Sequence, residues 1–175
     1  MTAYLRAADR SDVAAIAGIY GHHVLHGLAS FELDAPSPDE MLRRFEAITA
    51  AGYPYFVATE GDRVLGYAYA SAFRTRPAYR YTVEDSVYID PAAAGRGIGR
   101  RLLLALIEAC TQAQFRQMIA VIGDSANHAS IGLHRACGFD RMNVFVATGF
   151  KHGRWVDTVF MQRALGDGDS SLPQK

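Results

Sequence analysis

Residues 91–103 combine two features that suit the binding of a phosphate group. The turn Gly95-Arg96-Gly97-Ile98-Gly99-Arg100 follows a strand-like run and leads directly into an apolar helical pattern. Backbone N–H groups in the first turn of a helix have no partner within the helix, and the helix dipole attracts an anion there. Together with the arginines of the turn, this pattern predicts a phosphate or pyrophosphate site. The alternative is a glycine-rich connection that binds no ligand.

The spacing of the glycines narrows the choice of phosphate ligand. A dinucleotide fingerprint needs its third glycine three residues after the second, and a P-loop needs Lys and then Ser or Thr after its last glycine; this turn has neither. It instead resembles the acyl-CoA pyrophosphate turn of the GNAT N-acetyltransferase family, Gln/Arg-x-x-Gly-x-Gly/Ala, which Gly97 and Gly99 match. Ala94 stands at the leading position. The resemblance therefore implies that Arg96 or Arg100 supplies the missing side-chain contact.

A second segment, residues 127–139, strengthens this resemblance. Its residues alone predict a short helix, because Asn127 is a good helix cap and Gly138 suits the position just past a helix end. An apolar side of Ile131, Leu133 and Ala136 is expected on that helix. The segment is similar to the family motif Asn-x-x-Ser-x-x-Leu-Tyr/His-x-x-x-Gly-Phe. The resemblance implies that Asn127 holds the arm of acetyl-CoA and that the helix flanks the thioester.

The family resemblance also implies where acetyl-CoA lies. In the family, the strand before the turn pairs with the pantetheine arm beside a gap in the sheet, and a main-chain N–H polarises the thioester. Unpaired donors require an interruption of strand pairing, so we expect a β-bulge within residues 81–89. The expected acetyl-CoA contacts are Val87, Tyr88, Ile89, Gly95, Arg96, Gly97, Ile98, Gly99, Arg100, Asn127 and Ser130. No metal is expected, since His22 and His26 share a helical face without further ligands.

Two residues are candidates for acid–base chemistry, because acetyl transfer to an amine needs a base for the amine and a proton for the departing thiol. Glu84 shares a strand face with Ser86 and Tyr88. We expect it to act as the base or to bind the amine; the alternative is a solvent-facing strand residue. His134 stands where many enzymes of the family carry a Tyr general acid. It is either that acid or a structural histidine of the helix.

The loop of residues 73–81 indicates the acceptor. Arginine binds a carboxylate in bidentate fashion and aromatic walls suit a small polarisable side chain, so Arg74, Arg76 and Tyr79 favour an α-amino acid. The alternative is a solvated basic loop. The expected substrate contacts are Phe31, Arg74, Thr75, Arg76, Tyr79, Glu84, Asp85 and Ser86.

Residues 3–163 as a whole are similar to the phosphinothricin and methionine sulfoximine N-acetyltransferases of this family. The resemblance implies that a homodimer acetylates the amine of a glutamate- or methionine-like amino acid analogue. The rival acceptors are a polyamine, an aminoglycoside or a protein N-terminus, although a basic loop disfavours a polycation. Outside the enzymes, the rival is a non-catalytic acyl-CoA-binding module, which the unusual Ala94 leaves open.

Composition limits the possible partners and location. The 175 residues have a formal net charge of zero and include two cysteines. We therefore expect no nucleic-acid or membrane partner, a cytoplasmic location, and Cys110 and Cys137 as packed, reduced thiols. No leader peptide and no membrane-spanning run are expected. We expect one acetyltransferase domain over residues 1–165 and a disordered tail over residues 166–175.

The order of the expected elements predicts the fold. Strands are expected at residues 4–7, 55–59, 64–73, 81–89, 118–122, 140–150 and 155–162, and helices begin after residues 9, 37, 97 and 127. The longest helix is expected over residues 98–114. Its inward residues are Leu102, Leu103, Leu106, Ile107 and Cys110. This order predicts an α+β, three-layer α/β/α GNAT-type fold around a mixed, mostly antiparallel central sheet.

Overall fold

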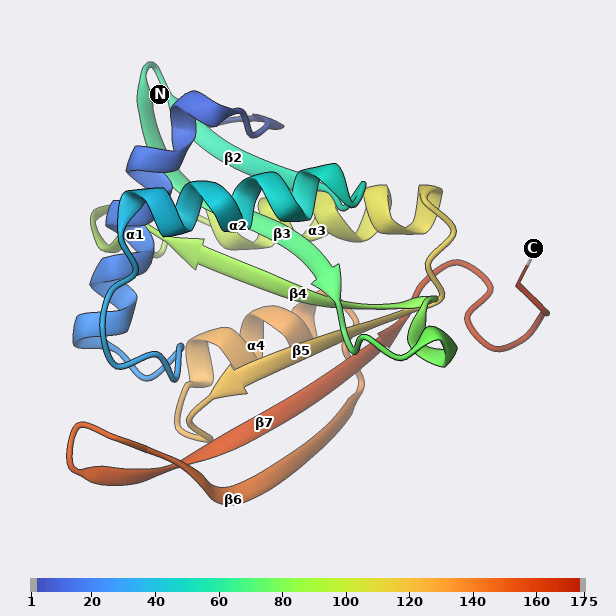
Figure 1. The fold of residues 1–175 in the computed structure, drawn as a ribbon. Coiled ribbons are helices and arrows are strands. Elements are labelled where there is room, and N and C mark those ends of the chain that lie inside the picture. The colour runs from blue at the N-terminus through green and yellow to red at the C-terminus, as the bar shows by residue number, and fades with distance from the viewer. Residues whose placement is uncertain (1–2, 174–175) are drawn as a thin grey trace.

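The computed structural model describes residues 3–173 and contains helices and strands close to those expected (Figure 1). In chain order the elements are β1 (Tyr4–Ala7), α1 (Val13–His26), α2 (Pro38–Ala50), β2 (Tyr55–Glu60), β3 (Arg63–Ala72), β4 (Thr82–Ile89), α3 (Ile98–Gln112), β5 (Gln117–Gly123), α4 (His128–Ala136), β6 (Arg141–Lys151) and β7 (Arg154–Ala164). Three short 3-10 helices cover Arg10–Asp12, Pro77–Tyr79 and Pro91–Ala93.

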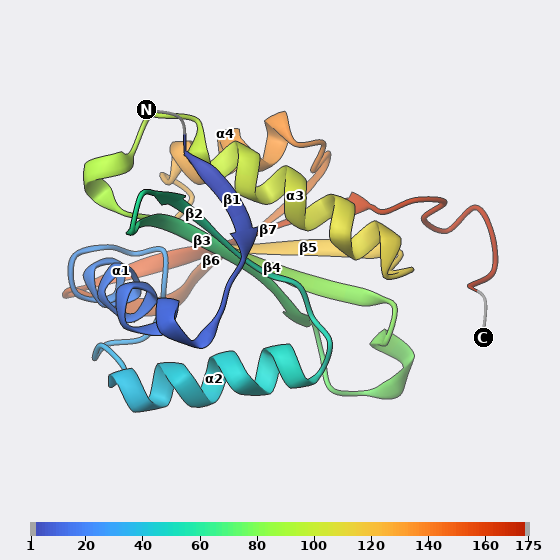
Figure 2. The ribbon, with the colours of Figure 1, turned by 90° about the horizontal axis from the view of Figure 1, so that it is seen from above.

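The strands form one sheet with helices on both faces. The strand order is β1-β2-β3-β4-β5-β7-β6. Only β4 and β5 pair in parallel; the other neighbours are antiparallel. Figure 2 shows α3 and α4 on one face and α1 and α2 on the other. The predicted three-layer fold around a mixed, mostly antiparallel sheet is confirmed.

Local signals in the sequence set the helix ends. Asp9 and Asp12 form a reciprocal capping box before α1, and the Ser37 side chain accepts a hydrogen bond from the backbone of Glu40 at the start of α2. Gly138, with φ +86°, follows α4 in the left-handed conformation that glycine adopts without strain. These ends agree with the predicted ones because each depends only on neighbours along the chain.

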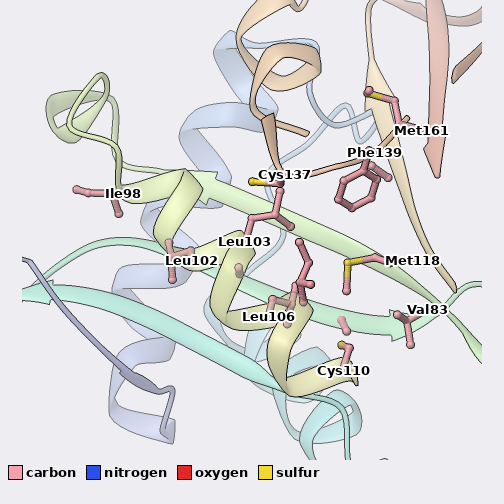
Figure 3. Close-up of a cluster of buried hydrophobic side chains, with 14 of the residues drawn as sticks. Val83, Ile98, Leu102, Leu103, Leu106, Cys110, Met118, Cys137, Phe139 and Met161 are labelled. Atoms are coloured by element: carbon pink, nitrogen blue, oxygen red, sulfur yellow. The ribbon is translucent and has the colours of Figure 1, made fainter. Parts of the chain in front are cut away.

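The main core lies between α3 and the sheet. Figure 3 shows this cluster. All five residues predicted to face inward on α3 are buried, and so are Met118, Phe139 and Met161 from the elements that follow. Both cysteines are free and buried, as predicted. One prediction on α4 is wrong: Ala136 is exposed, because the helix turns Ile131, Leu133 and the buried His134 inward instead.

The parallel pair β4–β5 is short, and the two strands then separate. They pair from Thr82↔Gln117 to Asp85↔Ala120. Beyond that point β4 continues beside β3 to Ile89↔Gly66, while β5 continues beside β7 to Gly123↔Thr158. Figure 1 shows the two strands fanning apart. The expected β-bulge is therefore wrong: β4 stays in register with β3, and divergence from β5 opens the sheet.

The last described residues, 166–173, contain no helix or strand. The Arg116 side chain donates hydrogen bonds to the carbonyls of Gly168 and Leu172 at 3.3 and 3.2 Å. The disorder expected for residues 166–175 remains a prediction from the sequence. Residues 174 and 175 lie outside the described residues. Among the residues that the structure describes, no helix is both long enough and apolar enough to cross a bilayer.

Candidate active site

A cleft of about 720 Å³ opens where β4 leaves β5. Its walls come from the end of α1, the end of β4, the turn before α3, and the first turns of α3 and α4. All the expected acetyl-CoA contacts line it except Arg96. Residues far apart in the sequence thus form one elongated site.

The glycine turn suits close approach of an anion. Gly95 and Gly97 have φ of +75° and +73°, and a β-carbon at either position would meet no atom within 4 Å. Both residues line the cleft, so a side chain there would project into open space. No side chain caps α3, whereas Ser37 caps α2 and Asn127 caps α4. The first N–H groups of α3 are therefore free to donate to a pyrophosphate.

The two arginines of the turn have different positions. Arg100 lines the cleft. The Arg96 guanidinium instead pairs with the Glu60 carboxylate at 2.7 Å, outside the cleft lining. Of the two arginines that could compensate for the short side chain of Ala94, Arg100 is thus the one that the structure places beside the cleft.

A smaller chamber of about 40 Å³ lies between the diverging strands and adjoins the cleft. Its lining shares Ala29, Val87, Tyr88, Gly123, Asn127 and Ser130 with the cleft. Asn127 is held as the α4 cap, since its side-chain oxygen accepts from the backbone N–H of Ser130 at 3.1 Å. The β4 backbone beyond Asp85 has no strand partner on the β5 side within the described chain. Its N–H groups can therefore polarise a carbonyl in the chamber.

His134 and Asp85 form a buried pair at the inner end of the chamber. His134 Nε2 lies 3.0 Å from Asp85 Oδ2, and Nδ1 lies 2.8 Å from the carbonyl oxygen of Ser130. The side chains are 5% and 1% exposed. Burial by itself lowers the pKa of His134, but the hydrogen bond to Asp85, its negative charge and the Ser130 carbonyl together raise that pKa above its ordinary value. Each ring nitrogen lies within hydrogen-bond distance of an acceptor oxygen, an arrangement that favours the protonated imidazolium.

Glu84 lies on the opposite face of β4, because side chains alternate along a strand. Burial raises the pKa of the Glu84 carboxyl, the positive charge of Arg74 lowers it, and Asp85 raises it further. On the same face, Ser86 hydrogen-bonds with the Tyr69 hydroxyl. Asp85 was expected beside them as a substrate contact, but it points to the α4 side of the sheet. The structure thus separates Glu84 from Asp85 and His134, whereas Ser86 lines the chamber together with them.

The basic loop is open to solvent. Arg74, Thr75, Arg76 and Tyr79 are all exposed. The Arg74 guanidinium lies 4.3 Å from the centre of the Phe73 ring and donates to the Phe73 carbonyl at 2.9 Å. Of the charged residues in this loop, it is Arg74 whose positive charge lowers the pKa of the Glu84 carboxyl.

A segment that sequence reasoning missed covers the junction of cleft and chamber. His23, His26 and residues 27–29 line the cleft, and Ala29 lines the chamber too. A β-carbon on Gly123 would lie 1.9 Å from the Leu28 carbonyl oxygen, so glycine is required for this crossing. No local signal marks the segment, because its place depends on contacts with β5 and β6.

Phe31 and Ser30 fix this segment to the β6–β7 hairpin. A β-carbon on Gly149 would lie 2.6 Å from the Phe31 ring, which is partly exposed. The buried Lys151 ammonium donates to the Ser30 carbonyl at 2.7 Å. The Tyr20 hydroxyl lies 2.9 Å from the Ser30 hydroxyl. Phe31, an expected substrate contact, therefore sits at the edge of the site rather than within the chamber lining.

The His23 side chain has a defined role at the cleft. Its Nε2 lies 2.8 Å from the carbonyl oxygen of Ile89 and must donate to it.

In the part of the chain that the structure describes, no group of three or more His, Cys, Asp or Glu side chains could hold a metal ion.

Comparison with known proteins agrees with this geometry. Residues 22–139 match the model of the Acetyltransferase (GNAT) family. The chain is 52% identical over 170 residues to a phosphinothricin N-acetyltransferase of Alcaligenes faecalis, covering 97% of this chain and 86% of that protein. It is 42% identical over 163 residues to an L-methionine sulfoximine/L-methionine sulfone acetyltransferase of Salmonella typhimurium, covering 93% and 95%.

A solved structure is similar along the whole chain. It is a GNAT superfamily phosphinothricin acetyltransferase from Sinorhizobium meliloti in complex with acetyl-CoA, with a TM-score of 0.96 and 55% sequence identity. The match covers 100% of this chain and 95% of that one.

Gly97→Val should abolish the rise in melting temperature that acetyl-CoA produces, because the new side chain would occupy the space where backbone approaches pyrophosphate. Gly52→Val is the matched control: its φ is +81° and its β-carbon also meets open space, but it lies after α2 and away from the cleft. Differential scanning fluorimetry with and without acetyl-CoA measures both. An intact thermal shift in Gly97→Val would show that the glycine turn does not bind acetyl-CoA.

Proposed function

The chain belongs to the GNAT family of acetyl-CoA-dependent N-acetyltransferases, and from this we propose that it acetylates the α-amine of a small amino acid or analogue. Phosphinothricin, methionine sulfoximine and methionine sulfone are the expected type of acceptor. The observation that carries this proposal is a half-buried carboxylate, Glu84, on β4 beside the opening of the sheet, with the Arg74 charge within electrostatic reach. The activities named for the relatives support it.

Glu84 is proposed as the base of the transfer. An incoming ammonium must lose a proton before its nitrogen can attack a carbonyl carbon. The raised pKa makes Glu84 a stronger base than an exposed glutamate, while the nearby Arg74 limits the shift and keeps the carboxylate available. Acetyl-CoA, when bound, supplies the activated acyl group; the chain positions it and removes the amine proton.

His134 is proposed to supply the acid side of the reaction. The departing sulfur gains electrons as the carbon–sulfur bond breaks, and it needs a proton or a positive charge nearby. His134 lines the chamber, and Asp85 keeps it protonated. His134 therefore lies in the chamber wall, whereas Glu84 lies on the opposite face of β4 and outside the lining of both cavities.

Arg74 is proposed to select a carboxylate on the acceptor. A guanidinium beside the base can hold the α-carboxylate of an amino acid while the amine points at Glu84. The site holds basic groups on this side, which disfavours a polyamine or aminoglycoside. A binding-only module would need neither a half-buried base nor a charged arginine beside it.

We also propose that the chain works as a homodimer in the cytoplasm. The β6–β7 hairpin exposes a group of large apolar side chains at one edge of the sheet. They are Met142, Val144, Phe145, Val146, Phe150 and Trp155, of which Val146 is 76% and Trp155 is 66% exposed. An apolar group of this size on a monomer favours contact with another chain. The two free, buried cysteines suit a reducing compartment.

Glu84→Gln should lower kcat by about 10²-fold, the usual loss when a general base is removed, and leave the KM for acetyl-CoA unchanged. In the native chain, kcat/KM should rise with pH through the raised pKa of Glu84, since only the ionised form accepts a proton. That rise should be absent in the variant. Glu108→Gln, on the exposed side of α3, is the control. Thiol release measured across a pH series tests both the loss of kcat and the pH dependence of kcat/KM. Native kinetics in Glu84→Gln would exclude the proposed role of Glu84 as the base.

Arg74→Ala should raise the KM for methionine sulfoximine by about fivefold to tenfold, corresponding to about 1 kcal/mol for a solvent-exposed ion pair. It should also reduce the preference for free amino acids over their amides. Arg76→Ala should do less, because its charge is not among those that act on the pKa of Glu84. An acceptor screen with methionine sulfoximine, phosphinothricin, their amides, spermidine and an aminoglycoside measures both. If spermidine or the aminoglycoside is preferred, the amino acid proposal is wrong.

Val146→Glu should convert the dimer into a monomer of 19.1 kDa, since a charge would be buried in the apolar contact. Leu25→Glu introduces the same charge at a 51% exposed apolar residue on α1 and should leave the dimer intact. Light scattering coupled to size exclusion reports the mass. A native chain of monomer mass at all concentrations would refute the dimer.

A further inference from the structure

Ser130 occupies a special position among the residues of the proposed active site. It lines both the cleft and the chamber, whereas His134 and Asp85 line the chamber alone. An arm that runs from the cleft into the chamber passes the junction between them. An arm held in this way would bring its sulfur, which joins the arm to the acyl group, to the residues shared by both cavities. His134 lies one helical turn further along α4 and lines the chamber but not the cleft.

The hydrogen bonds of His134 leave it no free proton to aim at the junction. Its Nε2 proton is directed to Asp85 Oδ2 at 3.0 Å, and its Nδ1 proton to the Ser130 carbonyl at 2.8 Å. The Nδ1 atom also lies 3.4 Å from the Ser130 hydroxyl oxygen. If that oxygen accepts from Nδ1, its own hydrogen is free to point away from the ring, toward the junction.

Among the residues that the structure describes, Asp85 is the one charged side chain within hydrogen-bond distance of His134. From α3 the titratable neighbour of the pair is Cys110, and from the end of α4 it is Cys137; burial raises the pKa of both thiols, so they stay neutral. Glu84 lies on the other face of β4. The β5 residues at the chamber, Ala120 and Ile122, are apolar.

The two carboxylate oxygens of Asp85 differ in their hydrogen bonds. Its Oδ2 accepts from His134, but its Oδ1 is buried without a hydrogen-bond partner and lies in the wall of the chamber. An ionised carboxylate with an unpartnered oxygen is costly in a core unless a cation is beside it. The imidazolium supplies that cation.

We propose that the Ser130 hydroxyl delivers the proton to the departing sulfur and that His134, positioned by Asp85, replaces that proton through Nδ1. The inference rests on the proposed acetyl transfer and specifies how its acid side works. Ser130 is then a catalytic residue, while His134 and Asp85 are positioning residues.

The proton and electron balance of the transfer is closed. The acceptor ammonium first gives one proton to Glu84, which releases it to solvent. The amine nitrogen then forms a bond to the acetyl carbon and gives a second proton to Glu84, and the carbon–sulfur bond breaks with its electron pair on sulfur. Sulfur takes the Ser130 proton, and the Nδ1 proton of His134 moves to the Ser130 oxygen. His134 is left neutral, with its remaining proton on Nε2 toward Asp85. Exchange with solvent returns one proton from Glu84 and one to His134.

The charge state of His134 also separates this relay from covalent catalysis by Ser130. A serine nucleophile needs a neutral histidine to accept its proton. An imidazolium with both nitrogens donating cannot do so. The Ser130, His134 and Asp85 side chains thus resemble a catalytic triad in composition, but they are arranged to give a proton.

Three variants test the relay with methionine sulfoximine as acceptor. Ser130→Ala should lower kcat by about 10²-fold near neutrality with little change in the KM for acetyl-CoA, and Ser130→Thr, which restores a hydroxyl, should recover most of that loss. Native kcat should fall as pH rises through the raised pKa of His134. Asp85→Asn removes the negative charge that raises the pKa of His134, so the decrease in kcat should occur at lower pH in this variant. In Ser130→Ala the fall should vanish.

The relay is overturned if Ser130→Ala keeps native kcat and its fall at high pH, or if Asp85→Asn does not move that fall. The double variant Asp85→Asn/His134→Gln, which leaves no unpaired buried charge, guards against loss of folding. It should retain more activity than Ser130→Ala, because the hydroxyl remains and solvent can reload it. If the double variant is less active than Ser130→Ala, then His134 itself donates the proton to the sulfur.

Two measurements are independent of any acceptor. The imidazole ¹⁵N spectrum of the native chain should show His134 protonated on both nitrogens near neutrality, and in Asp85→Asn it should lose one proton at lower pH. A neutral His134 near neutrality overturns the relay even if no acceptor is found. Mass spectrometry after mixing with acetyl-CoA alone should show no acetyl group on Ser130; a stable adduct there would replace the relay with covalent catalysis. Failure of every amine to release thiol would instead refute the proposed function.

Discussion

The separation of β4 from β5 is the constraint on which the site depends. The two strands pair over Thr82–Asp85 and Gln117–Ala120 and then follow different neighbours, β3 and β7. An open gap in a sheet leaves backbone groups without partners, which is costly unless a ligand or water pairs with them. Here the gap is the wall of the cleft and the chamber. The same feature that weakens the sheet provides the donors that an acyl group requires.

The separation also explains why the helices that border the gap differ in their caps. Asn127 caps α4 with its side chain and at the same time lines the junction of cleft and chamber. The N-terminus of α3 has no side-chain cap and begins at a glycine with positive φ. One helix end is thus closed by the protein, and the other is left for the ligand. A side-chain cap on α3 would compete with a pyrophosphate for the same N–H groups.

The adjacent carboxylates of Glu84 and Asp85 lie in different environments beside the gap. Glu84 faces the layer of α1 and α2, its charge acts on the pKa of Tyr69 and Tyr88, and its own pKa is raised by burial. Asp85 faces α3 and α4, and its charge is matched by His134. Because the strand alternates, one step along the chain moves a carboxylate from one side of the sheet to the other. The proposed base and the proposed acid system are therefore separated by the sheet rather than by sequence distance.

Much of this protein follows from patterns that act over a few residues. The helix caps, the glycine turn, the buried face of α3 and the succession of strands along the chain depend on local spacing, and the sequence predicted the fold class and the residues that come together at the cleft. It failed where distant segments decide. The expected bulge was wrong because divergence of two strands is set by their other neighbours. The Asp85–His134 pair joins residues 49 positions apart, the His23–Ile89 hydrogen bond spans 66, and the Lys151–Ser30 contact that fixes the loop over the junction spans 121. Side chains become partners at such distances only when the packed sheet and helices bring them together, so only the tertiary structure could show which oxygen atoms lie beside the two ring nitrogens of His134.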